Sequence, residues 1–349
     1  MARHQITDES PRESLDLGTW RELALEFQAA LRTAVVGQNH VIKLLTIAVF
    51  ARGHVLLEGD VGVGKTTLLR AAARALGGTF ERVEGTIDLM PVDLIYYTYL
   101  DEDGRPRVDP GPMLRHGNDL TVFFFNEINR ARPQVHSLLL RLMAERSVTA
   151  FNREYHFPYL IVFADRNRIE REETFEIPAA ARDRFFMEIT MEVPNDREIR
   201  RELAFDPRFY DADALVDSVP QDVLDYRLLA SASHAIQTRV HASAALERYT
   251  LDLWNAVRDP VSVGIDIEGV DMARLVQGGA SPRGMAYLVR AARVAAWLDG
   301  RAIVVPEDLR SVFDEVMAHR VFLDPIYELR HDKLLKSLFR AVFATVPVP

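Results

Sequence analysis

One short stretch of the sequence combines glycines, a lysine and a threonine at a spacing that suits phosphate binding. The pattern of a glycine, any four residues and then Gly-Lys-Ser/Thr is fulfilled by Gly59-Asp60-Val61-Gly62-Val63-Gly64-Lys65-Thr66. The glycines let backbone N–H groups turn toward phosphate oxygens, and a following helix N-terminus adds its positive dipole end. Lys65 would reach the β- and γ-phosphates of a nucleotide, and the Thr66 hydroxyl would ligate Mg²⁺. We count Thr67 with the same binding set. The alternative is an ordinary glycine-rich turn with a surface lysine.

A nucleotide site of this kind also needs acidic or polar side chains on a second strand. Thr121-Val122-Phe123-Phe124-Phe125 is an apolar run typical of a strand buried on both faces of a parallel sheet, and Asn126 and Glu127 follow it. Glu127 would stand in the crevice at the carboxyl edge of the sheet, where such sheets bind ligands, and could act as a base. It could instead simply pair with Arg130 or Arg132.

The elements around these residues follow an α/β pattern. Hydrophobic periodicity predicts helices over 19–33, 40–51 and 66–76, and apolar runs predict strands over 54–57, 159–164 and 185–193. Two further segments, near 94–108 and 147–157, alternate around turn-forming residues and are expected to form hairpins.

Several motifs occur together in one order. They are Val36-Gly37-Gln38, Gly59 to Thr66, Asn126 to Ala131, Arg166 to Glu170, Ile177-Pro178 with Asp183-Arg184-Phe185, and Ser281-Pro282-Arg283. This ordered set resembles the MoxR family of AAA+ ATPases over roughly residues 20–325. The resemblance implies a P-loop NTPase core, with a parallel sheet flanked by helices, and an α-helical lid. One position departs from the family, which usually has Asp-Glu where this chain has Asn126-Glu127. A carboxamide oxygen can accept a hydrogen bond from a magnesium-bound water but lacks the charge, which puts metal retention and turnover in doubt.

The resemblance also implies roles for single residues. Asn167 looks like the sensor-1 residue that helps to hold the attacking water and the γ-phosphate. Arg184 resembles the arginine finger that reaches the nucleotide of a neighbouring subunit, with Arg182 and Arg130 as alternatives. Arg283 resembles sensor 2 of the lid. Val36, Gly37 and Gln38 are expected at the nucleotide as well. The two hairpins resemble inserts that line or approach the pore of a ring.

The chain divides into three segments by this interpretation. Residues 1–17 are expected to form a flexible tail, residues 18–194 the nucleotide-binding α/β domain, and residues 195–349 a linker and the helical lid. The segment after 194 carries helical patterns, for example with Pro306 in a first turn, and shows no catalytic motif of its own.

Composition narrows the classes of function. The 349 residues contain no cysteine, which excludes disulfides, zinc–thiolate sites, iron–sulfur clusters and thiol nucleophiles. With 42 Lys and Arg against 51 Asp and Glu, the net charge of −9 gives no global attraction for nucleic acid or an anionic membrane. No apolar run is long enough for membrane insertion, so we expect a cytoplasmic protein.

These observations lead to one functional hypothesis and two alternatives. We expect ATP and Mg²⁺ as cofactors and a homo-oligomeric, hexameric ring that hydrolyses ATP to remodel a protein client. The resemblance implies a von Willebrand factor A-domain partner and a task in enzyme maturation or metal and cofactor insertion. A nucleotide-dependent switch or scaffold with little turnover is the first alternative, because of Asn126. A nucleic-acid motor is the second, and the negative charge and lack of a DNA-binding module disfavour it.

Overall fold

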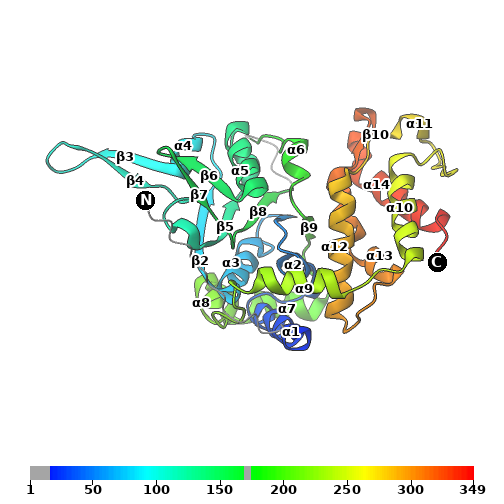
Figure 1. The fold of residues 1–349 in the computed structure, drawn as a ribbon, viewed down its shortest axis with the longest axis horizontal. Coiled ribbons are helices and arrows are strands. Elements are labelled where there is room, and N and C mark those ends of the chain that lie inside the picture. The colour runs from blue at the N-terminus through cyan, green and yellow to red at the C-terminus, as the bar shows by residue number, and fades with distance from the viewer. Residues whose placement is uncertain (1–15, 169–173) are drawn as a thin grey trace, which may run out of the picture.

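The computed structural model describes residues 16–168 and 174–349. Figure 1 shows two bodies side by side, an α/β body built from residues up to about 240 and a helical body built from the remainder. Residues 1–15 of the expected tail, and Ile169 and Glu170 of one family motif, lie outside the described residues.

The α/β body is organised around a five-stranded sheet in the order β2-β5-β8-β1-β9. All four strand pairings are parallel. The strands are β1 (Val55–Gly59), β2 (Thr79–Glu84), β5 (Leu120–Asn126), β8 (Ile161–Asn167) and β9 (Met187–Met191). The predicted parallel sheet is confirmed, and each predicted strand agrees with the observed one to within a few residues.

Apolar residues of β5 alternate between the two faces of the sheet. Val122 and Phe124 pack in the cluster that contains α1 (Leu17–Ala34), α2 (Asn39–Phe50) and α3 (Lys65–Leu76). Phe123 and Phe125 pack in the opposite cluster, with α5 (Pro133–Glu145) and α6 (Ala179–Arg182). Helices on both faces of a parallel sheet require strands that are apolar throughout, which explains the unbroken run in the sequence.

The first helix begins earlier than the sequence predicts. Leu17, which was placed in the tail, is already helical, because the Asp16 carboxylate caps the helix and accepts hydrogen bonds from the backbone N–H groups of Gly18 and Thr19. An aspartate in this position satisfies N–H groups that have no partner within the helix.

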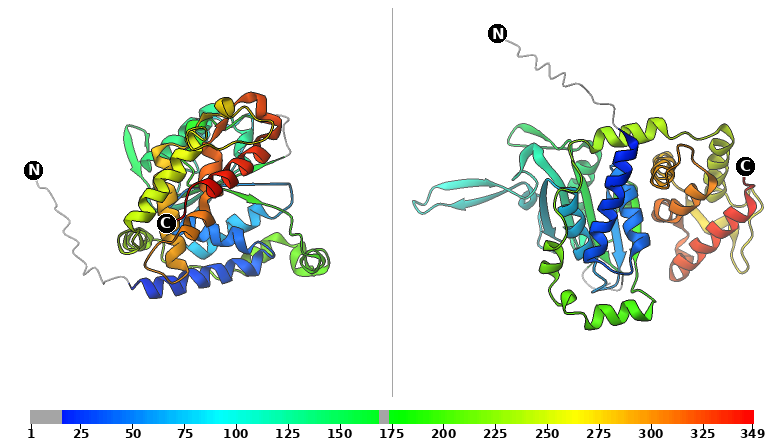
Figure 2. Two further views of the ribbon diagram at one scale, coloured as in Figure 1. Left: turned by 90° about the vertical axis from the view of Figure 1, so that its right-hand side faces the viewer. Right: turned by 90° about the horizontal axis from the view of Figure 1, so that it is seen from below.

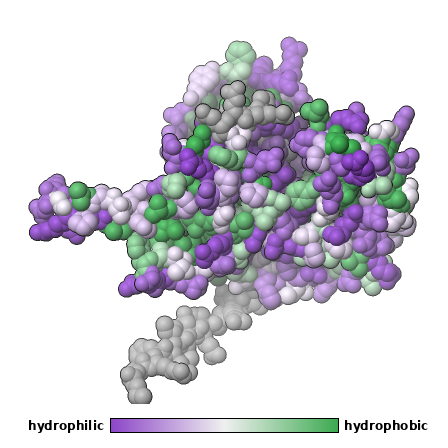
Figure 3. All heavy atoms as spheres, turned by 90° about the horizontal axis from the view of Figure 1, so that it is seen from above, coloured by the Kyte–Doolittle hydropathy of each residue, from purple (hydrophilic) through white to green (hydrophobic). Residues whose placement is uncertain are grey.

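Two hairpins project from the α/β body. The longer one pairs β3 (Tyr96–Leu100) with β4 (Pro106–Pro110), and the shorter pairs β6 (Ser147–Ala150) with β7 (Arg153–His156). Leu94 and Ile95, expected in a strand, instead end the helix α4 (Pro91–Ile95), because Asp93 accepts a hydrogen bond from the N–H of Met90 and stabilises a helical turn. Figure 3 shows the longer hairpin as an arm with mixed polar and apolar surface.

Three helices follow the last strand of the sheet and lead to the second body. They are α7 (Arg197–Phe205), α8 (Ala212–Asp217) and α9 (Leu229–Arg239). Helix α8 packs against α3, and α9 contacts both α1 and the helical body. In Figure 2 this segment wraps around the α/β body before the chain enters the second body.

The helical body consists of five helices and a small antiparallel pair of strands. Its elements are α10 (Ala244–Arg258), α11 (Met272–Leu275), α12 (Pro282–Leu298), α13 (Pro306–Met317), α14 (His331–Thr345), β10 (Val276–Gly278) and β11 (Phe322–Leu323). Among the described helices, none combines the length and apolar character needed to cross a membrane.

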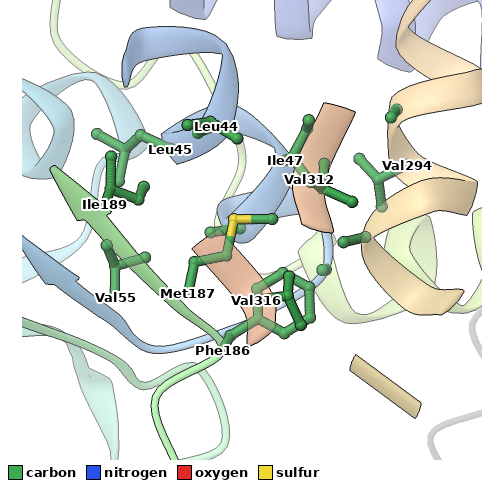
Figure 4. Packing of buried hydrophobic residues seen from close by; sticks show 14 of the residues in the cluster. Leu44, Leu45, Ile47, Val55, Phe186, Met187, Ile189, Val294, Val312 and Val316 are labelled. Atoms are coloured by element: carbon green, nitrogen blue, oxygen red, sulfur yellow. The ribbon is translucent and has the colours of Figure 1, made fainter. Parts of the chain in front are cut away.

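The two bodies share one hydrophobic core. Figure 4 shows Ile47 of α2 and Met187 of β9 beside Val294 of α12 and Val312 of α13. Two hydrogen bonds reinforce the contact, since Trp297 donates to the backbone oxygen of Leu17 at 3.0 Å and Arg21 donates to that of Leu298 at 2.8 Å. The lid is therefore packed against the sheet side that carries α1 and α2.

Candidate nucleotide-binding site

The glycine-rich loop joins the end of β1 to the start of α3, as the motif requires. Gly62 and Gly64 have φ angles of +80° and +93°, which only glycine adopts without strain. A side chain at Gly59 would place its Cβ 2.4 Å from the backbone oxygen of Met191 on β9. Asp60, Val61 and Val63 fill the loop between the glycines, and Thr67 lies in the first turn of α3.

Lys65 is buried inside the loop, with 6% of its surface exposed. Its ammonium group donates hydrogen bonds to the backbone oxygens of Gly59 (2.9 Å) and Asp60 (2.8 Å) and to the Asn167 side-chain oxygen (2.8 Å). The structure thus brings together two residues that lie about a hundred positions apart and that were assigned to one site from the sequence. A solvated surface lysine would not be held in this way.

Thr66 and Asn126 also meet, as the metal prediction requires. The Thr66 hydroxyl donates to the Asn126 side-chain oxygen at 3.2 Å, and Asn126 is 5% exposed. The Asn126 amide donates in turn to the carboxylate of Glu84, at the end of β2. Glu84 was not among the predicted residues.

Glu127 follows β5 at a backbone φ of +51°, an uncommon conformation for a residue with a side chain. One carboxylate oxygen accepts from the Asn167 amide at 3.1 Å and the other from Arg130 at 3.0 Å. The pairing with Arg130 that was kept as an alternative is therefore present, and the contact with Asn167 exists beside it. Both carboxylate oxygens face hydrogen-bond donors.

A buried carboxyl group lies behind Glu127. Asp165 on β8 is 2% exposed and accepts a hydrogen bond of 2.6 Å from the backbone N–H of Glu127. Burial is the main reason that the pKa of Asp165 is raised to about 6. The hydrogen bond from Glu127 and the charge of Lys65 oppose the rise, and the charges of Glu127 and Glu84 add to it. Asp165 was not among the predicted residues, although an aspartate inside an apolar strand, two residues before Asn167, was a usable signal.

The three candidate finger arginines differ in their surroundings. Arg130 pairs with Glu127, and Arg182 lies 3.8 Å from the carboxylate of Glu188. Arg184 donates to the backbone oxygen of Ala180 at 2.8 Å. Among the described groups, the Nε atoms of Arg182 and Arg184 are both buried without a hydrogen-bond partner, so this feature does not separate the two.

Arg283 makes its hydrogen bond to the residue before Arg184, and within the described residues it makes none to the P-loop. It pairs with Asp183 at 2.6 Å, and Ser281 and Arg320 donate to the other Asp183 oxygen at 2.8 and 3.2 Å. Burial lowers the pKa of Arg320 to about 10, so its guanidinium stays charged at neutral pH. Asp183, the residue before Arg184, therefore holds three side chains of the lid. Sequence analysis quoted Asp183 only as part of a motif.

The Val36-Gly37-Gln38 segment lies between α1 and α2. Gly37 has a φ of +77°, and a Cβ there would meet Pro194 and Ile199 at 2.9 Å. The Gln38 amide donates to the backbone oxygen of Glu192 at 2.7 Å, and Val36 is partly exposed beside it. These contacts tie the segment to the chain that follows β9.

The oxygen donors at the P-loop fit a magnesium ion bound together with a nucleotide. Mg²⁺ takes oxygen ligands and in phosphate-binding sites keeps several waters, with one or two protein groups and the phosphates completing its shell. Thr66 and Asn126 offer two neutral oxygens of this type. Within residues 16–168 and 174–349, no three His, Asp or Glu side chains gather into a metal cluster. The metal would therefore depend on the phosphates.

Comparisons with known proteins agree with this geometry. Residues 54–187 match the family described as "ATPase family associated with various cellular activities (AAA)", and residues 271–336 match an AAA lid domain. The chain is 66% identical to Protein MoxR of Methylorubrum extorquens, over 95% of this chain and 97% of that protein. It is 60% identical to Protein MoxR of Paracoccus denitrificans, over 96% and 98%.

Two more distant proteins are also similar along most of the chain. Chaperone MoxR1 of Mycobacterium tuberculosis is 32% identical, over 91% of this chain and 80% of that protein. The crystal structure of a candidate ATPase from Cytophaga hutchinsonii superposes with a TM-score of 0.78 at 27% identity, over 95% of this chain and 97% of that one. Both bodies of the fold are covered by these matches.

Proposed function

Because the chain belongs to the MoxR family of AAA+ ATPases, we propose that it binds ATP with Mg²⁺ at the P-loop and hydrolyses the terminal phosphate bond. The observation that carries this proposal is the hydrogen-bonded series from Lys65 through Asn167 to Glu127. It joins the phosphate-binding cation to the candidate base through a single amide. Both members are placed at the carboxyl edge of a parallel sheet, where ligands bind in folds of this kind.

Each residue has a distinct task in this proposal. Lys65 neutralises charge on the β- and γ-phosphates, and Thr66 with Asn126 holds the metal. Bound Mg²⁺ supplies positive charge that offsets the charge developing on the phosphates. Glu127 orients the attacking water and accepts its proton. Asn167, which contacts both Lys65 and Glu127, holds the water and the γ-phosphate in line.

We further propose that Arg184 acts in the neighbouring subunit of a hexameric ring. Arg130 and Arg182 each have an acidic partner within their own subunit, whereas Arg184 donates its hydrogen bond to a backbone oxygen. An arginine that reaches a transferring phosphate from outside stabilises the transition state. This difference in partners favours Arg184 over the two alternatives.

The proposed task of the ring is to remodel a protein client. One relative in this family carries the name Chaperone MoxR1, which is consistent with this role. We propose a von Willebrand factor A-domain protein as the partner and maturation of an enzyme, with metal or cofactor insertion, as the outcome. Co-expression with such a protein, followed by purification through a tag on that protein, tests the pairing. Recovery of the chain only when ATP is present supports it, and equal recovery with an unrelated tagged protein contradicts it.

A nucleotide-dependent switch with little turnover is the competing function. The neutral side chain of Asn126, where the family usually has aspartate, favours it. The two functions differ in one measurement, because a switch binds ATP but does not release phosphate in a single turnover.

The primary test is Lys65→Ala, with Lys43→Ala as a matched control. Lys43 is partly exposed and pairs with Asp299 of the helical body at 2.9 Å. Loss of charge-assisted hydrogen bonds should weaken ATP binding about ten- to a thousandfold in Lys65→Ala. Calorimetric titration should find no such loss in the control. Equal ATP affinity for Lys65→Ala and the wild-type protein would overturn the proposed site.

A further inference from the structure

The carboxylate that position 126 lacks has a substitute on the adjacent strand. Glu84 and Asn126 are the last residues of β2 and β5, and they are direct partners in the register of the two strands. The Asn126 amide nitrogen donates to one oxygen of the Glu84 carboxylate. The other oxygen of Glu84 accepts from Arg82 at 2.9 Å. The negative charge of Glu84 therefore lies beside position 126, where the family usually has an aspartate.

This contact fixes which way the Asn126 amide points. An amide side chain has an NH₂ group that only donates and an oxygen that only accepts, whereas a carboxylate only accepts. Because the NH₂ group of Asn126 faces Glu84, its oxygen must face the opposite side. There it accepts from the hydroxyl of Thr66 at 3.2 Å. Glu84 thus directs the Asn126 oxygen toward the side chain that a P-loop uses to ligate magnesium.

We propose that Glu84 and Asn126 form one unit that replaces the single aspartate usual at this position of the metal site. Glu84 supplies the negative charge and orients the amide, and Asn126 supplies the oxygen nearest to Thr66. This inference rests on the proposed function, since it assigns roles toward Mg²⁺ bound with ATP. Glu84 is a positioning residue in this unit, and its side chain is half-exposed, so its charge remains hydrated.

If Glu84 and Asn126 act together, each single substitution should disturb the charge or the hydrogen bond between them, and the double substitution should restore both. Glu84→Gln removes the charge but keeps an oxygen that can accept from Asn126. Asn126→Asp creates two carboxylates in contact, where like charges disfavour joint ionisation. In the double variant, the amide at position 84 can donate to the carboxylate at position 126. One charge and one hydrogen bond are then restored with the two groups exchanged.

The test measures magnesium-dependent nucleotide binding in the full chain rather than turnover. A fluorescent, non-hydrolysable ATP analogue is titrated at a series of Mg²⁺ concentrations, and also in excess chelator. Glu84→Gln should raise the Mg²⁺ concentration for half-maximal binding about five- to thirtyfold, the scale of a lost charged contact through water. Its affinity for the metal-free analogue should be equal or higher, because a negative charge near the phosphates has been removed. The double variant should return to within about threefold of the wild-type value.

Arg82→Gln is the matched control, because it removes the other partner of Glu84 from the same strand. It should leave the magnesium midpoint unchanged. An unchanged midpoint in Glu84→Gln, an equal shift in Arg82→Gln, or a double variant no closer to wild type than Glu84→Gln would each overturn the inference. Loss of analogue binding both with and without Mg²⁺ would also overturn it, since it would indicate a structural role. If the wild-type protein binds no analogue under any condition, the proposed function itself fails, which is a separate result.

Discussion

Replacement of Glu127 by glutamine tests the assignment of the base most directly. Both oxygens of the Glu127 carboxylate accept hydrogen bonds, from Asn167 at 3.1 Å and from Arg130 at 3.0 Å. Glutamine has one acceptor oxygen and one donor NH₂ group, so it can keep only one of these contacts. The variant Glu127→Gln therefore loses the base and leaves one of the two donors without its present acceptor.

The expected effect is much larger on turnover than on binding. A positioned general base contributes about 10²- to 10⁴-fold to a rate, which corresponds to about 3–5 kcal/mol of activation free energy. ATP affinity should stay within about fivefold of wild type, because the groups proposed to bind the phosphates are Lys65 and the loop that holds its ammonium group, and Glu127 is not among them. The variant should therefore retain ATP without hydrolysing it.

Single-turnover hydrolysis of radiolabelled ATP and equilibrium binding on the same preparations separate the two quantities. Glu145→Gln serves as the control, since Glu145 lies on α5 with a half-exposed side chain 3.9 Å from Arg141. If Glu127 served only its ion pair with Arg130, the variant would lose thermal stability and keep its rate of hydrolysis. A single-turnover rate equal to that of the control would refute the assignment.

Three further outcomes are expected. Arg184→Ala should abolish turnover but not ATP binding, and mixing it with Lys65→Ala should restore part of the activity; no rescue in mixed oligomers confirmed by mass measurement would contradict a role in trans. Gly85→Ala should lower the free energy of unfolding by about 1–3 kcal/mol in denaturant titrations, because its Cβ would lie 2.1 Å from the Glu127 backbone oxygen, whereas Gly278→Ala, with its nearest atom at 3.5 Å, should not. Burial lowers the pKa of His54 from 6.5 to about 3, so the unfolded chain binds a proton that the folded one does not. As the pH is lowered from about 7.5 to 5.5, protonation of this group in the unfolded chain should lower the free energy of unfolding by about 1.4 kcal/mol. His54→Gln should remove this part of the pH dependence.

Local sequence patterns were sufficient for the loop and for four of the five strands of the sheet, whereas β2 (Thr79–Glu84) was not predicted. The run from Val122 to Phe125 is apolar throughout because β5 lies inside the sheet, between β2 and β8, with helices on both faces. The glycines of the P-loop were informative because Gly62 and Gly64 have positive φ angles that other residues rarely adopt. These features depend on residues close together in the chain, so a local sequence pattern is enough to predict them.

Contacts between segments were harder to predict. Asp183 gathers Ser281, Arg283 and Arg320, which come from about one hundred or more residues further along the chain. Their meeting depends on how the lid packs on the sheet, and no local pattern specifies that packing. Asp165 was not predicted for a similar reason, because its role comes from a hydrogen bond that it accepts from the backbone of Glu127, the residue after the adjacent strand β5.

The departure at Asn126 illustrates why the charge of a site cannot be judged from a single sequence motif. In the linear sequence, asparagine in place of aspartate is a lost charge, and it favours a site that holds metal poorly. In the sheet, strand register sets Glu84 directly opposite Asn126, and parallel strands bring their carboxyl ends to the same edge. The charge of the site is the sum over residues that meet there, whichever strand carries each one. An amide that donates to a carboxylate on one side and presents its oxygen to Thr66 on the other keeps both the charge and the acceptor near the loop. For this reason the substitution alone is a weak argument for an inactive switch, and the exchange of the two groups between positions 84 and 126 is the stronger test.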